Sequence, residues 1–316
     1  MANISISNQQ PDQRPHRLAR IASRFNHPAV WLSAPAFVAV IVLFIYPFLY
    51  GVFISFHGGY VGEKPWTLSN YTSLLTDPSL GFGHVLLNTF AISVPTTLIS
   101  VIVSIPLAYY MRHGIRLERI ITILLVLPIT LGTVMVAQSM LTYFNPRGWF
   151  DRTLVLVLSW VGIPINAPNI LHTQLAVDIA LFLLGFPFVF LLILGYMSAV
   201  NPDLERASRM MGANAWQTFW RVNFPLALPG IAVAFSLNFV ANFGVFPSAV
   251  VVGDPNGSSN VIAYQAFHQA FENYNLPLGT AIAVVMGAIQ LVVIGVVLWL
   301  QSRVAHGSAI SGGKGA

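Results

Sequence analysis

The chain has 316 residues, of which 56% are hydrophobic and only 8% are charged. Because soluble domains carry about 25% charged residues, this composition excludes an ordinary soluble protein and predicts an integral membrane protein. The net charge of +5 does not indicate a nucleic-acid partner, since the basic residues are spread over several short connections. With no cysteine in the chain, disulfides, thiolate metal sites and cysteine nucleophiles are excluded.

Six apolar stretches are each long enough to cross a bilayer, which requires roughly 20 residues. They lie near residues 29–56, 85–111, 120–144, 174–199, 226–252 and 278–300. The prediction is an all-α integral membrane domain over residues 29–303, with a flexible tail at 1–28 and another at 304–316.

Breaks in regular helix are expected at several points. The spans are interrupted by Pro95, Pro106, Pro128 and Pro187, which membrane helices tolerate when their neighbours satisfy the freed backbone groups. Gly244 and Pro247 are expected to break the fifth span. Residues 149–163 are too short to span, so they are expected to lie at the outer interface or to re-enter the membrane.

The basic residues are distributed asymmetrically between the two sides. Of the 15 Lys and Arg residues, only Lys64, Arg147 and Arg152 lie in the alternate connections, and the others lie in the two tails and the second and fourth connections. The positive-inside rule therefore places both termini and residues 201–225 in the cytoplasm.

Residues 201–225, NPDLERASRMMGANAWQTFWRVNFP, form a polar, amphipathic segment between the fourth and fifth spans. Asn201 suits an N-cap, Gly212 permits a turn, and Pro225 with Pro229 is expected to end the helix and begin a span. A helix–turn–helix at the cytoplasmic surface is predicted, with a small, flat patch at Ala207, Ser208, Gly212 and Ala213. Such a segment rests on lipid or binds a protein partner; its small residues and mixed charge favour the partner.

This segment resembles the EAA-x3-G-x9-I-x-L-P loop of permease subunits of binding-protein-dependent ABC importers. Arg206, Ala207 and Ser208 occupy the EAA positions before Gly212, while Val222, Phe224 and Pro225 occupy the end of the motif. The sequence departs from the motif at Arg206, although Glu205 stands one residue earlier. Which of these two side chains contacts the ATPase is left open.

The resemblance implies the type I importer permease fold, with a coupling helix that fits a groove of the ATP-binding subunit. The residues it assigns to this contact are Glu205, Arg206, Ala207, Ser208, Gly212, Ala213 and Pro225. It implies a bacterial inner-membrane complex with a second permease subunit or copy, two ATP-binding subunits and an extracytoplasmic solute-binding protein. ATP and magnesium are expected on the partner ATPase, with no cofactor on this chain.

The solute class is indicated only weakly. Residues 241–253, ANFGVFPSAVVVG, and Met211 at a position where sugar permeases usually have Asp resemble permeases for polyamines, iron and aminophosphonates. A polyamine-like solute is favoured, with a sugar importer as the alternative.

Polar residues inside the spans are candidates for the translocation pathway. Asp178 lies about one turn into the fourth span. It either lines a pathway or lies close enough to the outer surface to remain hydrated. Asn238 and Asn242 share one helix face and either line a pathway or bond a neighbouring helix.

No catalytic set is found, so an enzyme is not expected; the sequence has no HExxH motif and no phosphate-binding loop. An ion-coupled secondary transporter is the alternative of another class. It is expected to show more buried ionisable residues and repeats of opposite topology, neither of which is evident.

Overall fold

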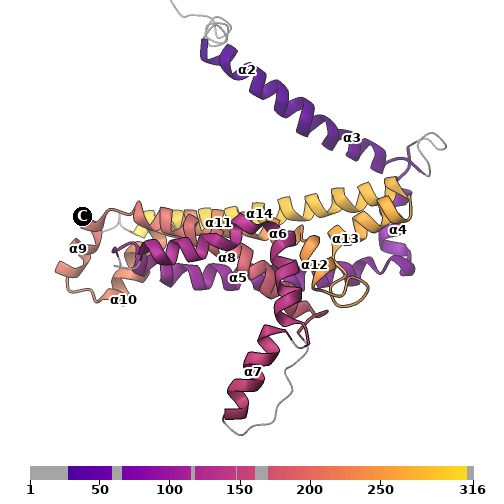
Figure 1. The fold of residues 1–316 in the computed structure, drawn as a ribbon. Helices are drawn as coiled ribbons and strands as arrows, with labels where there is room; N and C mark the ends of the chain where they lie inside the picture. Colours follow the sequence, from indigo (N-terminus) through magenta and orange to yellow (C-terminus); the bar gives the residue numbers. More distant parts are fainter. Residues whose placement is uncertain (1–27, 59–65, 115–117, 147, 161–169, 312–316) are drawn as a thin grey trace, which may run out of the picture. The chain divides into compact units, whose positions relative to one another are not determined.

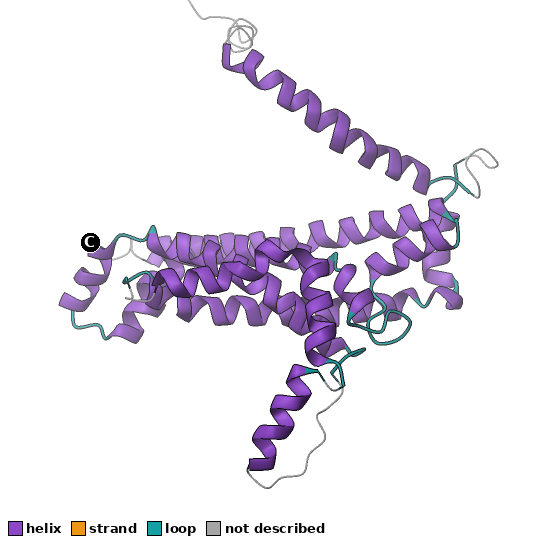
Figure 2. Ribbon diagram, viewed as in Figure 1, coloured by secondary structure: helices purple, strands orange, loops and turns teal. Residues whose placement is uncertain are grey.

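The computed structural model describes residues 28–58, 66–114, 118–146, 148–160 and 170–311, and every regular element among them is helical (Figure 1, Figure 2). The predicted N-terminal tail falls almost wholly outside these residues. The chain divides into two compact units, residues 1–53 and 54–316. The all-α prediction is confirmed.

Six helical stretches among the described residues are long and apolar enough to cross a membrane, as the sequence predicts. In chain order they are formed by α2 (Pro28–Val40) with η1 (Ile41–Ile45) and α3 (Tyr46–Ser55), then α5 (Phe82–Met111), α6 (Glu118–Phe144), α8 (Gln174–Ser198), α11 (Phe224–Phe243) and α14 (Leu276–Ser311). The last helix runs on to Ser311, into the segment that was predicted to be a flexible tail.

The expected helix breaks are only partly realised. The helices run through all four prolines, since Pro95 and Pro106 lie inside α5, Pro128 inside α6 and Pro187 inside α8. Helix α6 instead contains a residue with non-helical dihedral angles at a position not predicted, Gly132, at φ 72° and ψ 163°. A residue without Cβ adopts this conformation readily. Of residues 149–163, predicted to lie at the outer interface or to re-enter, Trp149–Trp160 form helix α7 and the last three lie outside the described residues.

The fifth span is shorter than predicted. Helix α11 ends at Phe243 rather than near residue 252, with Gly244 as its C-cap. After a short connection, α12 (Pro247–Val251) begins at Pro247, whose missing N–H costs nothing in the first turn of a helix. The predicted break at Gly244 and Pro247 is therefore confirmed, and it terminates the span.

The interior of the second unit forms where α5, α8 and α11 meet. One buried apolar cluster joins these helices to the segment after α9, with members Val101, Ala108, Met111, Val189, Phe190, Ile193, Met197, Phe219, Ala227, Ile231 and Ala234. A row of buried hydroxyls runs along α5, including Thr89, Ser93 and Ser100, each bonded to the carbonyl four residues earlier. Small residues of this kind let membrane helices approach closely.

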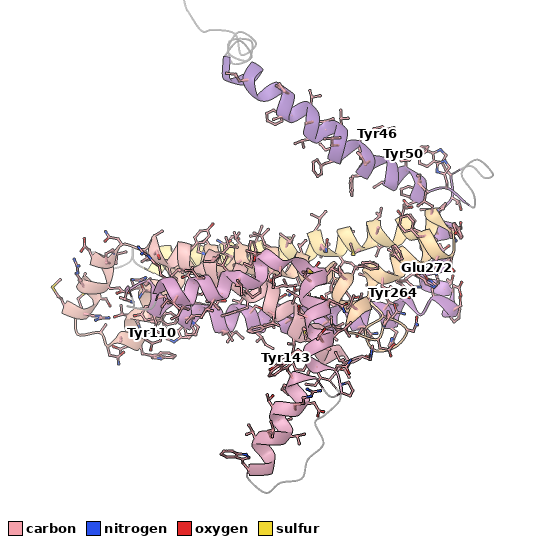
Figure 3. All side chains as sticks on the ribbon, in the orientation of Figure 1. Tyr46, Tyr50, Tyr110, Tyr143, Tyr264 and Glu272 are labelled. Carbon is pink, nitrogen blue, oxygen red and sulfur yellow. The ribbon has the colours of Figure 1, made fainter. Side chains whose placement is uncertain are left out.

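The second unit has two distinct ends (Figure 1). At one end lie α9 (Pro202–Met210), α10 (Ala215–Thr218), η3 (Phe219–Asn223) and the C-terminal end of α14. At the other lie α4 (Ser69–Thr76), α13 (Ile262–Phe267) and η4 (His268–Glu272). Figure 3 labels Tyr110 at the first end and Tyr264 with Glu272 toward the second. Residues 201–225 and the end of the last span therefore share one side.

Candidate functional site

Helix α9 begins as its sequence predicts. The Asn201 side chain accepts a hydrogen bond from the backbone N–H of Asp203 at 2.9 Å, and Pro202 occupies the first turn. Asp203 and Glu205 lie in the first turn and Arg209 in the last, the placement that the helix dipole favours. The N-cap prediction is confirmed.

The turn after α9 depends on Gly212, which has φ +88°. Its N–H donates to Arg209 O at 3.0 Å, and the N–H of Ala213 donates to Ser208 O at 3.2 Å. A Cβ added at Gly212 meets no atom of this chain within 4 Å, so the glycine is required for its backbone angle and not for internal space. The predicted turn is confirmed.

The second half of the segment has its own cap. Asn214 and Gln217 form a capping box, in which each side-chain oxygen accepts the other residue's backbone N–H, at 2.8 and 3.0 Å. The two halves are joined by the buried hydroxyls of Ser208 and Thr218, whose oxygens lie 3.1 Å apart. Ser208, predicted to lie on the partner-facing patch, is therefore used to hold α9 against α10.

Pro225 does not end the second helix, contrary to the prediction. From Ala215 the chain stays helical through η3 and α11 to Phe243, with Pro225 in the first turn of α11 and Pro229 inside it. The preceding five residues form a π-helical turn, whose wider winding suits a position where proline removes a regular hydrogen bond. Surface segment and span are one continuous helix.

Glu205 faces the inside of the chain. Its Oε1 atom accepts from Arg112 Nη2 at 2.5 Å and from Asn223 Nδ2 at 2.7 Å, and its Oε2 atom lies 3.3 Å from His113 Nε2. The side chains of Arg112 and Glu205 are only 5% and 8% exposed. Glu205 is thus enclosed by its own chain, although the sequence assigned it to the ATPase contact.

Burial alone raises the pKa of Glu205. The Arg112 charge and the hydrogen bonds from His113 and Asn223 outweigh that effect, so the pKa lies below its ordinary value. The group is therefore an ionised carboxylate at neutral pH, paired with a guanidinium that satisfies it.

The outer surface of the segment carries different residues. Arg206 Nη1 donates to Asp203 Oδ1 at 2.9 Å in an exposed pair. Met210 and Met211, at the turn, are each 83% exposed, and Leu204 is also exposed. Methionine is flexible and polarisable, and it is frequent at surfaces that bind other proteins. Of the predicted patch, Gly212 is exposed while Ala207 and Ala213 are half-buried.

Asp178 lies one turn into α8, half-buried against α5. Its Oδ1 atom is 3.1 Å from Thr96 Oγ1, which also donates to the backbone carbonyl of Ile92 at 2.7 Å. The structure thus places this carboxyl group at the junction of two spans, beside the row of hydroxyls on α5.

Asn238 and Asn242 are both buried between helices, with exposures of 1% and 2%. Asn242 Nδ2 donates to Thr97 Oγ1 on α5 at 3.0 Å. Asn238 Oδ1 faces Gly185 on α8, at a point where a Cβ would not fit, and its Nδ2 atom has no partner among the described residues. Asn242 therefore bonds a neighbouring helix, whereas a pathway role for the two side chains stays a prediction.

Sequence reasoning missed Arg112, Asn223 and the hydroxyls of Thr96 and Thr97. Arg112 entered only as one of the basic residues that set the orientation. A signal was nevertheless present, because an arginine at the end of a span and an acidic residue in an adjacent connection on the same side are natural partners. Asn223 carries no such signal, since its neighbours are known only once the helices are packed.

The fold and the surface segment define a class of protein, a six-span helical membrane protein with a helix–turn–helix between its fourth and fifth spans. The model of the family "Binding-protein-dependent transport system inner membrane component" matches residues 100–307, and the chain belongs to this family. It is a multi-pass inner-membrane permease and not an enzyme. The resemblance to ABC importer permeases is confirmed, which sets aside the alternative of a secondary transporter.

Curated relatives carry names from two transport systems. The chain is 26% identical over 223 residues to the probable sulfate transport system permease protein cysT of Chlorokybus atmophyticus, covering 69% of this chain and 75% of that protein. It is also 26% identical over 249 residues to the spermidine/putrescine transport system permease protein PotB of Escherichia coli (strain K12), covering 76% and 84%. These similarities do not separate the two solutes.

Solved structures share the fold. A bacterial ABC transporter involved in the import of the acidic polysaccharide alginate matches with a TM-score of 0.73 at 19% identity, covering 91% of this chain and 99% of that chain. An inward-facing MetNI methionine ABC transporter matches with a TM-score of 0.53 at 16% identity, covering 74% and 99%. The type I importer permease fold is therefore confirmed.

Proposed function

We propose that this chain is the permease subunit that couples a separate ATPase to the import of a small cationic solute of the polyamine kind. In this assignment residues 201–225 dock in a groove of the ATP-binding subunit. Glu205 and Ser208 complete the inner contacts of the segment, which leaves Arg206, Ala207, Gly212 and the two methionines beside the turn to meet the partner. A surface segment that is rigid inside and apolar at its tip suits a protein groove.

The solute class rests on one observation, the carboxyl group of Asp178. Apart from Glu118, the first residue of α6, it is the only acidic side chain in the six described spans. Arg119 and Arg303 lie instead at the ends of their spans, and Arg221 lies in η3, before α11. A carboxyl group inside a membrane domain attracts a cation and repels a dianion such as sulfate. This supports a polyamine-like solute over sulfate. A neutral sugar is not attracted electrostatically by the carboxyl group.

The proposed assembly extends this assignment to the whole importer. A second permease subunit or copy, two ATP-binding subunits and an extracytoplasmic solute-binding protein complete the importer, with ATP and magnesium held by the ATPase. Both termini and residues 201–225 are cytoplasmic in this arrangement. In support, one solved relative is an alginate transporter in complex with a periplasmic protein bound to an alginate pentasaccharide.

Uptake into proteoliposomes tests the solute class. The complex is reconstituted with its binding protein, and uptake of labelled putrescine, spermidine, sulfate and a disaccharide is compared with ATP enclosed. We expect ATP-dependent uptake of the polyamines alone. Sulfate or sugar uptake with no polyamine uptake would reject the proposed solute while leaving the permease assignment in place.

Two variants test the role of Asp178. Asp178→Asn is expected to reduce polyamine uptake about threefold, with assembly and ATPase binding intact, because it removes the charge but keeps the shape and the contact with Thr96. Asp254→Asn is the matched control, since Asp254 lies in a connection outside the spans. Unchanged uptake kinetics in Asp178→Asn would mean that the carboxyl group is incidental.

A further inference from the structure

We propose that Arg112 is a positioning residue, whose buried ion pair with Glu205 makes the coupling segment move as one body with the ends of three spans. This inference rests on the proposed coupling role of residues 201–225. It adds a residue from the second connection, outside the loop motif, to the parts that transmit movement.

One guanidinium joins four elements. Arg112 directly follows α5, and its Nη1 atom donates to Met197 O at the end of α8 and to Asn223 Oδ1 in η3, each at 3.1 Å. Its Nη2 atom donates to Glu205 on α9. Asn223 Nδ2 also donates to Glu205, so the three side chains form a closed triangle.

The triangle removes the freedom that the chain connections leave. Helix α9 follows α8 after only a short connection, and η3 continues directly into α11. The segment is thus tethered at both ends, but these tethers alone permit it to rock about the line that joins them. Phe219 in η3 already packs against Tyr109 of α5, and the contact with Arg112 adds an attachment of α9 itself, so that both halves of the segment are held against α5.

The chemistry of the triangle requires arginine. The planar guanidinium presents fixed donors in several directions at once, and here they reach a carboxylate, an amide oxygen and a helix C-terminal carbonyl. A lysine ammonium keeps the charge but lacks this fixed fork. Because the pair is buried, loss of one partner leaves an uncompensated charge, whereas loss of both does not.

The same geometry explains the departure from the loop motif. The acidic side chain at 205 points inward to Arg112, while Arg206 points outward and pairs with Asp203. The acidic residue of this loop therefore serves attachment within the chain, and the basic residue lies on the side that meets the partner.

The test uses the full chain in the assembled importer, with Arg112→Met, Arg112→Lys and the double variant Arg112→Met/Glu205→Leu. Arg119→Met is the matched control, because Arg119 is an exposed arginine near the start of α6. Three quantities are measured: co-purification with the ATPase, solute taken up per ATP hydrolysed, and the mobility of a spin label at Met211→Cys. The label is read in the permease without its ATPase, because Met211 lies on the surface proposed to meet that subunit, and the chain has no competing cysteine.

We expect the double variant to assemble at a reduced yield, since it leaves no unpaired buried charge but deprives the buried Asn223 amide of both its partners. Its label is expected to be more mobile than in the parent, and its uptake per ATP to fall about tenfold. Arg112→Lys should fall between the parent and the double variant, and Arg119→Met should match the parent. If Arg112→Met does not insert into the membrane, the double variant alone tests the positioning role.

Parental uptake per ATP in the assembled double variant would overturn the positioning role. If Arg112 serves only the stability of the fold, the variants give a lower yield of complex but the same uptake per ATP. Measuring yield and uptake per ATP separately therefore distinguishes this role from positioning. If Gly212→Leu abolishes stimulated hydrolysis while the double variant is normal, only the positioning role fails. If neither variant affects coupling, the proposed role of residues 201–225 fails as well.

Discussion

Asn242 donates a hydrogen bond from Nδ2 to the hydroxyl of Thr97 at 3.0 Å, and this bond ties α11 to α5 inside the bundle. We expect Asn242→Ala to lower the thermal unfolding midpoint slightly and to leave uptake per assembled complex unchanged. Side-chain hydrogen bonds between membrane helices contribute about 0.6 kcal/mol on average. A double-mutant cycle with Thr97→Val should recover a coupling energy of that size. A loss of uptake at unchanged stability would instead place Asn242 in the pathway.

Gly212 offers the sharpest test of the coupling segment. We expect Gly212→Leu to reach the membrane at normal levels but to lose stimulated ATP hydrolysis and uptake together. The positive φ alone makes a residue with a Cβ unfavourable by about 1–2 kcal/mol. Gly195→Leu is the matched control, because Gly195 lies in α8 with open space around it and no positive φ. Gly212→Asn separates strain from bulk, since asparagine accepts positive φ better.

Ala207→Arg is expected to act like Gly212→Leu. Ala207 is half-buried beside the turn, so an arginine there places an unpaired charge in the proposed interface, which is costly. Gln217→Glu should change little, because glutamate serves equally well in the capping box with Asn214. Each variant is co-purified with the ATPase, and its ATPase activity and its uptake are then measured. Full coupled activity in both Ala207→Arg and Gly212→Leu would reject the coupling assignment.

The orientation of the chain is testable because the sequence has no cysteine. A single cysteine at Met211 is expected to react with an impermeant maleimide only from the cytoplasmic side, and one at Asn256 only from outside. Met211 lies in the connection that precedes α11 in the chain, and Asn256 lies in a connection that follows it. Labelling of Met211→Cys from outside would show that no ATPase reaches this segment.

The attachment of the coupling segment should depend on pH in acid only. A group whose folded pKa is lowered contributes stability that is complete above its ordinary value and is lost as the pH falls through the folded value. For Glu205 the ordinary value is 4.5, so the contribution is intact at neutral pH and disappears below that value. Spin-label mobility at Met211→Cys between pH 7 and pH 3 should show one acid transition. Glu205→Gln should have high mobility throughout, and an identical transition in that variant would contradict the assignment.

The sequence predicts the large features of this fold because each depends on local chemistry. Span number follows from apolar length, and the N-cap at Asn201 and the turn at Gly212 follow from residue type. The same local reasoning overextends the fifth span to residue 252, since the apolar residues continue past the end of α11 at Phe243. Hydropathy does not mark this stop, whereas residue type does, at Gly244 and Pro247.

The site is predicted less completely than the fold. Spacing identifies residues 201–225, but not that Glu205 faces inward and Arg206 outward, because this depends on how α9 rests on the ends of the spans. Pro225 misleads for a different reason: proline signals a break, yet the π-helical turn Phe219–Asn223 accommodates it and the helix continues from Ala215 to Phe243. Contacts such as Asn242 with Thr97 join residues far apart in the chain, and no local pattern specifies them.

The uninterrupted helix from Ala215 to Phe243 has a mechanical consequence. At 1.5 Å per residue its 29 residues make a lever of roughly 43 Å, with the proposed docking surface at one end and Gly244 at the other. A tilt of about 10° imposed at Ala215 displaces the far end by roughly 7 Å, more than one helical turn. We expect the break at Gly244 to act as a hinge. The displacement of the end of α11 is then not passed on to α12 or to the connection after it.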